Sequence, residues 1–192
     1  MARIRFDGGT AGVLIAVAGL LATAGAAIAL ALPDTGYSRA LSLAPTHEAR
    51  ADALVRTPGL GESGRLEARS ETLAGLHQAP ANATAWLRLS YLDARSPAGL
   101  GREGNLAFAR SYAVAPFGPD DTMWRLDFAF DHWAALDRSN RLLVLDELRR
   151  IPARQARALQ AGVTDPTGQL ALALSLDAAD PTAIPGRRAP RL

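Results

Sequence analysis

The sequence contains neither cysteine nor lysine. Without cysteine, the chain cannot form disulfides, bind zinc through thiolates or use a cysteine nucleophile. Without lysine, all 21 basic residues are arginine, and with 19 acidic residues the formal net charge is only +2. So small a charge, with no basic stripe carrying interleaved aromatic residues, does not indicate nucleic-acid binding. We therefore expect a globular chain with no nucleic-acid partner.

One long apolar run, AGVLIAVAGLLATAGAAIALAL, occupies residues 11–32 and carries no charge over its 22 residues. As a helix rising about 1.5 Å per residue it would span roughly 33 Å, enough for the hydrocarbon core of a bilayer. The sequence therefore predicts a transmembrane helix. A cleaved signal peptide is the alternative, because Ala29-Leu30-Ala31 supplies a cleavage site, although the apolar part of a signal peptide usually has about 7–15 residues.

Basic residues set the expected orientation of this helix. Arg3 and Arg5 precede it, and Arg39 is the only basic residue shortly after it. The positive-inside rule then places residues 1–10 in the cytoplasm and the rest of the chain outside. Abundant alanine and arginine are typical of a GC-rich bacterial genome, so we expect a single-pass inner-membrane protein with a periplasmic domain.

Small residues recur along the apolar run. Ala18, Ala22 and Ala26 are spaced by four residues, and small side chains at this spacing let two membrane helices approach closely. These alanines are candidates for transmembrane packing against a partner helix. The general abundance of alanine explains the same pattern.

Prolines mark a repeat in the rest of the chain. Pro45, Pro80, Pro116 and Pro152 are separated by 35, 36 and 36 residues, a period typical of stacked helix pairs. Proline ends a helix, and the residues that follow can cap the next one: Thr46, Asn82, and Asp120 or Asp121. We predict an all-α domain over residues 33–180 and a disordered basic tail over 181–192.

These stretches resemble tetratricopeptide repeats (TPRs), in which one helix ends Y-x-x-A-L-x-L-x-P and the next begins around W-x-x-L. The matching residues are Tyr37, Ala40, Leu41, Leu43 and Pro45 for the first pattern, and Trp86 and Leu89 for the second. Other units depart from the pattern, since Gly75 and Ser111 replace the usual alanine and Trp124 comes two positions late. The resemblance implies a TPR-like array of about three antiparallel helix pairs.

Two stretches have the literal form G-x-G-x-x-G of a dinucleotide-binding loop: GLGESG at residues 59–64 and GLGREG at 99–104. That motif needs a buried strand before it, and neither stretch has one. Both occupy the same place in consecutive units. We interpret them as turns in which glycine supplies positive φ between two helices, and we expect no cofactor.

The most amphipathic segment covers residues 120–136, with apolar residues on one face and Asp121 and Arg125 at the i,i+4 spacing of an ion pair. The paired helix, residues 141–151, is predicted to turn Glu147 and its other charged residues to water. Candidate interaction residues in this region are Trp124, Arg125, His132 and Arg141. Core packing is the other interpretation of the tryptophan.

A second resemblance covers roughly residues 85–162, where the order S-Y-x-x-x-P, W-R-L-x-x-A-x-x-x-W-x-x-L and R-L-x-V is similar to VpsP-type envelope proteins encoded with exopolysaccharide genes. The residues are Ser111, Tyr112, Pro116, Trp124, Arg125, Leu126, Ala129, Trp133, Leu136, Arg141, Leu142 and Val144. The resemblance implies an accessory role in polysaccharide synthesis or export.

Residues 165–177 are ambiguous. Asp165 and Pro166 form a helix start, yet the leucines at 170, 172, 174 and 176 alternate as in a strand. Leucine and alanine favour helix, so we predict a final helix, with a strand offered to a partner as the alternative.

No catalytic set is recognisable in the sequence. His47, His77 and His132 lack metal-ligand spacing, and no G-x-S-x-G motif is present. We therefore predict a non-enzymatic interaction scaffold, without metal or cofactor, that binds other envelope or membrane proteins. The alternative is a structural subunit of a stable membrane complex, held through both its transmembrane helix and its helical domain.

Overall fold

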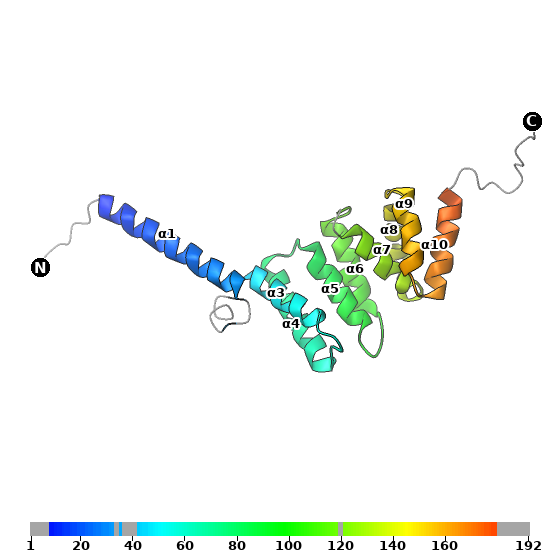
Figure 1. Cartoon of the computed structure of the whole chain (residues 1–192), viewed down its shortest axis with the longest axis horizontal. Helices are drawn as coiled ribbons and strands as arrows, with labels where there is room; N and C mark the ends of the chain where they lie inside the picture. The colour runs from blue at the N-terminus through cyan, green and yellow to red at the C-terminus, as the bar shows by residue number, and fades with distance from the viewer. Residues whose placement is uncertain (1–7, 33–34, 36–41, 119–120, 180–192) are drawn as a thin grey trace, which may run out of the picture. The chain divides into compact units, whose positions relative to one another are not determined.

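The computed structural model describes residues 8–32, 35, 42–118 and 121–179 (Figure 1). Within these ranges every regular element is a helix, which confirms the all-α prediction. The helices are α1 (Gly8–Ala31), α3 (Ala44–Val55), α4 (Glu62–Gln78), α5 (Ala83–Ala94), α6 (Arg102–Val114), α7 (Thr122–Asp131), the 3₁₀ turn η1 (Trp133–Ala135), α8 (Arg138–Leu148), α9 (Ala153–Gly162) and α10 (Pro166–Ala179).

The chain divides into two compact units, residues 1–80 and 81–192. The first unit holds α1, α3 and α4, and the second holds α5 to α10. Tyr37, Ala40 and Leu41 of the TPR pattern, Asp120 and the tail at 181–192 lie outside the described residues, as does nearly all of the predicted cytoplasmic segment 1–10. Among the helices that the structure describes, none is long and apolar enough to cross a membrane.

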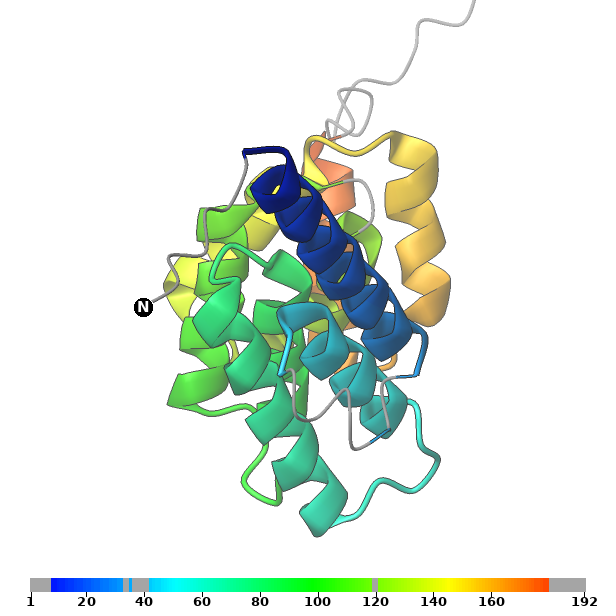
Figure 2. The same cartoon turned by 90° about the vertical axis from the view of Figure 1, so that its left-hand side faces the viewer.

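In the first unit, α3 and α4 lie side by side in both views (Figures 1 and 2). Pro45 is the second residue of α3 rather than the end of an earlier helix. This position suits proline, because the first turn of a helix does not use its backbone N–H groups. The predicted cap at Thr46 is wrong: Thr46 lies inside α3, buried, and its hydroxyl donates to the carbonyl of Leu43.

The glycine stretches connect helices, as predicted. Gly59 has φ +70° and Gly99 has φ +72°, the left-handed conformation that glycine adopts without strain. Gly61 and Gly101 are the N-cap residues of α4 and α6. The two stretches therefore hold equivalent turns in the two units, 40 residues apart.

The third glycine of each stretch lies where a side chain from the turn folds back. A Cβ at Gly64 would lie 2.6 Å from Leu60 Cδ1, and one at Gly104 would lie 2.5 Å from Leu100 Cδ1. In the second unit the Asp93 carboxylate also reaches over, accepting bonds from the N–H groups of Gly101 (2.8 Å) and Gly104 (3.0 Å). All three glycines of the motif thus have a structural role.

The helix pairs repeat at a longer spacing than the prolines. The starts of α3 and α5 are 39 residues apart, and those of α4 and α6 are 40 apart. The proline spacing of 35 is shorter because Pro45 lies within α3, whereas Pro80 precedes α5. Asn82 caps α5 as predicted, since its Oδ1 accepts from the Ala85 N–H at 3.1 Å.

The core of the second unit takes buried residues from α5 to α10, with more from α7 than from any other helix. Its fully buried members include Phe108, Leu126, Phe130 and Val144. Residues 166–177 of the ambiguous segment belong to α10, so the segment is a helix, as predicted. Asp165 Oδ2 accepts from the Gly168 N–H at 2.7 Å and so caps its first turn.

Candidate functional site

The four predicted interaction residues do not form one surface. Trp124 is 43% exposed on α7, whereas the neighbouring Arg125 is 0% exposed. His132 is half-buried just after α7, and Arg141 is half-buried on α8.

Arg125 lies inside the second unit, so its predicted role as a docking residue is wrong. Its guanidinium lies over the Tyr112 ring, 4.2 Å from the ring centre, and donates to the carbonyl of Ala115 at 3.1 Å. The distance from Nη1 to Glu147 Oε1 is 3.9 Å. The predicted partner Asp121 instead accepts from the Thr84 hydroxyl at 3.0 Å. Arg125 is therefore an interior residue that connects α7 to Tyr112 and to the Ala115 carbonyl.

Glu147, predicted to face water, is only 2% exposed. Its carboxylate accepts from the Tyr112 hydroxyl at 2.6 Å and from the Thr122 hydroxyl at 2.8 Å. Burial, and then the negative charge of Glu147, raise the pKa of Tyr112 well above its ordinary range. The phenol therefore stays protonated and donates to the carboxylate.

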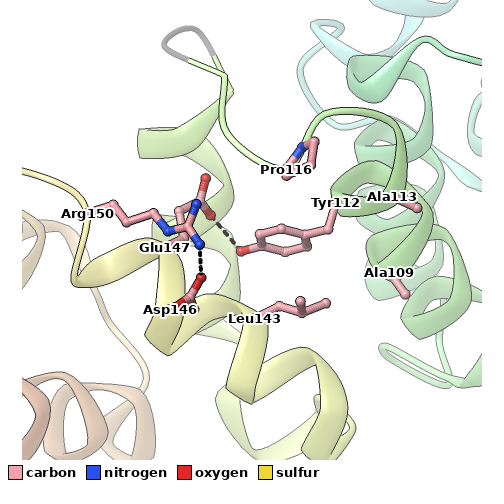
Figure 3. Close-up of a pocket in the computed structure, with 8 residues that line it drawn as sticks. All are labelled: Ala109, Tyr112, Ala113, Pro116, Leu143, Asp146, Glu147 and Arg150. Carbon is pink, nitrogen blue, oxygen red and sulfur yellow. Dashed lines mark hydrogen bonds and ion pairs between the residues drawn. The ribbon is translucent and has the colours of Figure 1, made fainter.

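A pocket of about 390 Å³ opens beside this network, between α6 and α8 (Figure 3). Tyr112 and Glu147 point toward one another across it, and Asp146 and Arg150 form an ion pair at its edge. The remaining lining residues are Ala109, Ala113, Pro116 and Leu143. The polar side chains of this pocket are thus hydrogen-bonded or ion-paired with one another, and the other lining residues are apolar.

The Trp124 groove is a second pocket, of about 310 Å³, between α7 and α9. Its lining residues are Met123, Trp124, Asp127, Ala158, Leu159 and Gly162. The Trp124 ring stacks on Phe128, with ring centres 5.2 Å apart and 7° between planes. Phe128 in turn stacks on His132 at 4.3 Å. One aromatic row thus supports the exposed indole.

Asp127 gives the Trp124 groove an acidic group. Burial, and then the nearby charge of Asp131, raise the pKa of Asp127. A carboxylate held partly out of water beside another carboxylate favours a cationic partner. The Trp124 groove therefore combines an apolar, aromatic wall with the carboxylate of Asp127.

Arg141 fixes the turn between α7 and α8. It donates to the carbonyls of Trp133 and Ala134, both at 2.9 Å, and its guanidinium lies 5.6 Å from the centre of the Trp133 ring. These bonds satisfy carbonyls of η1. Of the four predicted residues, Trp124 is the one that combines exposure with a groove.

The transmembrane-packing candidates lie on α1. Ala18 and Ala22 are exposed and Ala26 is half-buried in the isolated chain. Their packing against a second helix stays a prediction.

A cluster in the first unit was missed by sequence reasoning. The Ser42 hydroxyl is 2.8 Å from His47 Nε2, and His47 Nδ1 is 2.6 Å from Glu71 Oε2. Ser42 and His47 are five residues apart, but Glu71 follows 24 residues later on α4. The packing of α3 against α4 brings it there, and no local motif signals it.

Comparison with known families, characterised proteins and solved structures finds no match to this chain. Among the described residues no group of three or more His, Asp or Glu side chains is placed to hold a metal ion. Any functional assignment therefore depends on the chain's own residues.

Proposed function

We propose that this chain is a TPR-like interaction module, anchored in a bacterial inner membrane, that docks envelope proteins in the periplasm. The observation that carries the proposal is the Trp124 groove. A tryptophan that is 43% exposed, stacked on a fixed aromatic row and next to a pocket, has the features of an interface anchor. Such residues contribute much of the free energy of binding at protein interfaces.

The residues that line the Trp124 groove indicate which kind of partner segment it would bind. Met123, Leu159 and Trp124 accept an apolar side chain, and Asp127 accepts a nearby positive charge. The partner segment we propose therefore carries an apolar residue close to an arginine or lysine. Polysaccharide synthesis or export machinery is the proposed setting, and the VpsP-type resemblance of residues 85–162 is what supports it.

The membrane anchor is proposed from residues 11–32 taken as one charge-free segment of the sequence. Large apolar side chains of α1, including Val13, Ile15, Leu20 and Leu21, are exposed in the isolated chain. Exposed apolar surface of this extent costs free energy in water, and a bilayer removes that cost. An anchor would also raise the effective concentration of partners held in the same membrane.

The TPR-like part of the proposal is supported by the repeated helix pairs. Pairs α3–α4 and α5–α6 have similar lengths and equivalent glycine turns. In repeat proteins, helix pairs that stack in series present extended surfaces that bind peptides or helices.

Co-purification tests the docking function. The tagged full-length protein is isolated in mild detergent, and retained proteins are identified by mass spectrometry. We expect Trp124→Ala to reduce partner recovery at least 10-fold and Asp127→Asn to reduce it less. The matched control is Leu142→Ala, because Leu142 is also exposed and apolar but does not line the groove.

Recovery of glycosyltransferase, polymerase or export subunits supports the polysaccharide setting. Full recovery with Trp124→Ala, in a variant whose circular dichroism is unchanged, overturns the docking proposal.

The alternative is a structural subunit held through its membrane helix, which the exposure of Ala18 and Ala22 favours. Replacing Ala22 by leucine would then release the protein from a stoichiometric complex, since a bulky residue prevents close helix approach. Under the docking proposal Ala22→Leu leaves recovery unchanged.

A further inference from the structure

Ser42, His47 and Glu71 form a continuous hydrogen-bonded chain in the first unit. Glu71 accepts from Arg50 Nη1 at 3.1 Å through both carboxylate oxygens, so it acts as an ionised acceptor. It also lies 2.6 Å from His47 Nδ1 and accepts a hydrogen bond from it in the neutral tautomer that carries its proton on Nδ1. In that tautomer Nε2, 2.8 Å from the Ser42 hydroxyl, accepts from it.

The order of groups is that of an activated nucleophile: a hydroxyl bonded to an imidazole that a carboxylate orients. His47 is 8% exposed, and Arg50, which holds the carboxylate from its other side, is also buried. Burial therefore holds the base in place, while the orienting Glu71 is half-buried and Ser42 is an exposed residue. The serine of this chain thus lies at the surface of the unit, where a substrate can reach it.

The backbone of Ser42 adds a second, independent observation. Its φ is +45°, and no other non-glycine residue in the described part of the chain has positive φ. Such a conformation costs free energy in a residue with a side chain and persists where the surroundings impose it. Gln78 on α4 helps to impose it by donating to the Ser42 carbonyl at 2.7 Å. Strained turns of this kind present nucleophilic serines in known hydrolases.

The Ser42 hydroxyl does not cap the helix that follows it. Serine just before a helix commonly accepts from the helix's first N–H groups. Here Leu43 is the N-cap of α3, and α3 has no side-chain cap bond. The hydroxyl bonds to His47 instead.

We propose that Ser42, His47 and Glu71 are a nucleophile, a base and an orienting group that together hydrolyse acyl esters. This activity goes beyond the docking function and does not depend on it. Because Ser42 lies at the surface, the substrate class we infer is a small acyl ester protruding from a larger molecule. Arg50 is a positioning residue, since its guanidinium donates to the Glu71 carboxylate.

The proposed hydrolysis consumes one ester and one water molecule and needs no other reactant. Ser42 Oγ bonds to the ester carbonyl carbon as its proton passes to His47 Nε2. The C–O bond to the alcohol then breaks, and the alcohol leaves with that proton. Water attacks the acyl-serine and gives a proton to His47. The carboxylic acid departs as Ser42 recovers the proton.

The test uses the full-length chain in mild detergent with a fluorophosphonate probe, which bonds covalently to activated serines. We expect labelling at Ser42, located by peptide mapping, and its loss in Ser42→Ala. The matched control is Ser96→Ala, because Ser96 also lies in a loop but its hydroxyl donates to the Gly99 carbonyl. Labelling that is absent, or located at other serines, overturns the proposal.

A second experiment measures whether the labelling of Ser42 depends on His47, because a serine that is only exposed would react equally without this base. We expect His47→Gln to slow labelling at least about 100-fold, the usual contribution of a general base. Equal labelling of a folded His47→Gln variant overturns the proposal. If this variant fails to fold, the pH profile of the native chain decides. A rise in rate across the range where histidines lose their proton supports the base, and a flat profile overturns it.

Discussion

The buried polar residues of the second unit form one small network around Glu147. Arg125, Tyr112 and Thr122 all direct donors or positive charge toward this carboxylate. A buried ion pair adds little net stability compared with apolar packing, but removing one partner leaves an uncompensated charge and costs several kcal/mol. The network therefore specifies how α6, α7 and α8 meet, more than it stabilises the unit.

Tyr112 makes the stability of this network depend on pH in the alkaline range. Its pKa is raised above the ordinary 10.0 by burial and by Glu147. The protonated phenol is therefore favoured in the folded state, and its contribution is complete below pH 10. It is lost as pH rises further, because the unfolded chain releases the proton first. We expect the free energy of unfolding to fall by up to about 1.4 kcal/mol per pH unit above 10.

Urea unfolding between pH 8 and 11, compared with Tyr112→Phe, measures this effect. The background is low because the chain has no lysine and only three tyrosines. The variant should lose about 1–3 kcal/mol at neutral pH, since Glu147 loses a donor, and should show a flatter alkaline decline. Equal alkaline slopes in the two proteins would contradict the assigned cause.

The burial of Glu147 could have been predicted only in part. Val144, Glu147 and Ile151 have the spacing of one helix face, which places Glu147 on the buried side. The charge of Glu147 predicts exposure instead, because ionised residues are almost never fully buried unless they are paired. The pairing depends on Tyr112 and Thr122, 35 and 25 residues away, and no local pattern reveals contacts at such separations.

At the scale of elements, the glycine turns were predictable because their requirement is local. Positive φ at Gly59 and Gly99 follows from the turn between two helices. The Asp93 cap on α6 was not predictable in the same way. It depends on how the end of α5 lies against the start of α6, and the first unit has leucine at 54, near the corresponding position.

This difference predicts unequal effects of the same substitution in the two turns. A Cβ at Gly104 would lie 2.5 Å from Asp93 Oδ2 and 2.9 Å from Asp93 Cβ, so the capping carboxylate must move. We expect Gly104→Ala to lower the free energy of unfolding by about 1–2 kcal/mol, as for loss of a helix cap.

Gly64→Ala is the matched control, because its Cβ would meet only the end of the flexible Leu60 side chain. We expect a change within about 0.5 kcal/mol, since alanine favours helix. Chemical denaturation of both variants measures the difference, and equal losses would show that the Asp93 cap contributes nothing.

Because α10 is a helix, leucines two residues apart on it should contribute differently to the free energy of unfolding. Leu172 is 0% exposed in the core, while Leu170 and Leu174 are each 61% exposed. We expect Leu172→Ala to cost about 3 kcal/mol, the usual range for a buried leucine. Leu170→Ala should cost less than about 0.5 kcal/mol. In a strand, Leu170, Leu172 and Leu174 would lie on the same face. Similar losses of stability from Leu170→Ala and Leu172→Ala would therefore contradict the helix.

At the scale of the whole molecule, the two proposed sites lie in different compact units. The serine cluster lies in residues 1–80, and the Trp124 groove lies in residues 81–192. Every member of the main hydrophobic cluster lies in the second unit. A substitution that unfolds one unit therefore need not abolish the function proposed for the other.

The same division predicts that residues 81–192 fold without the first unit. All three tryptophans, Trp86, Trp124 and Trp133, belong to this part of the chain, so tryptophan fluorescence reports on its unfolding alone. We expect the isolated fragment to unfold cooperatively, with the same fluorescence midpoint as in the full-length protein. Glu71→Gln should leave this midpoint unchanged, and Leu172→Ala should lower it by several degrees.

Circular dichroism of the full-length protein, which also reports on α3 and α4, should follow a different curve from fluorescence. A single coincident transition, or a fragment without cooperative unfolding, would instead show that the second unit depends on the first for its stability.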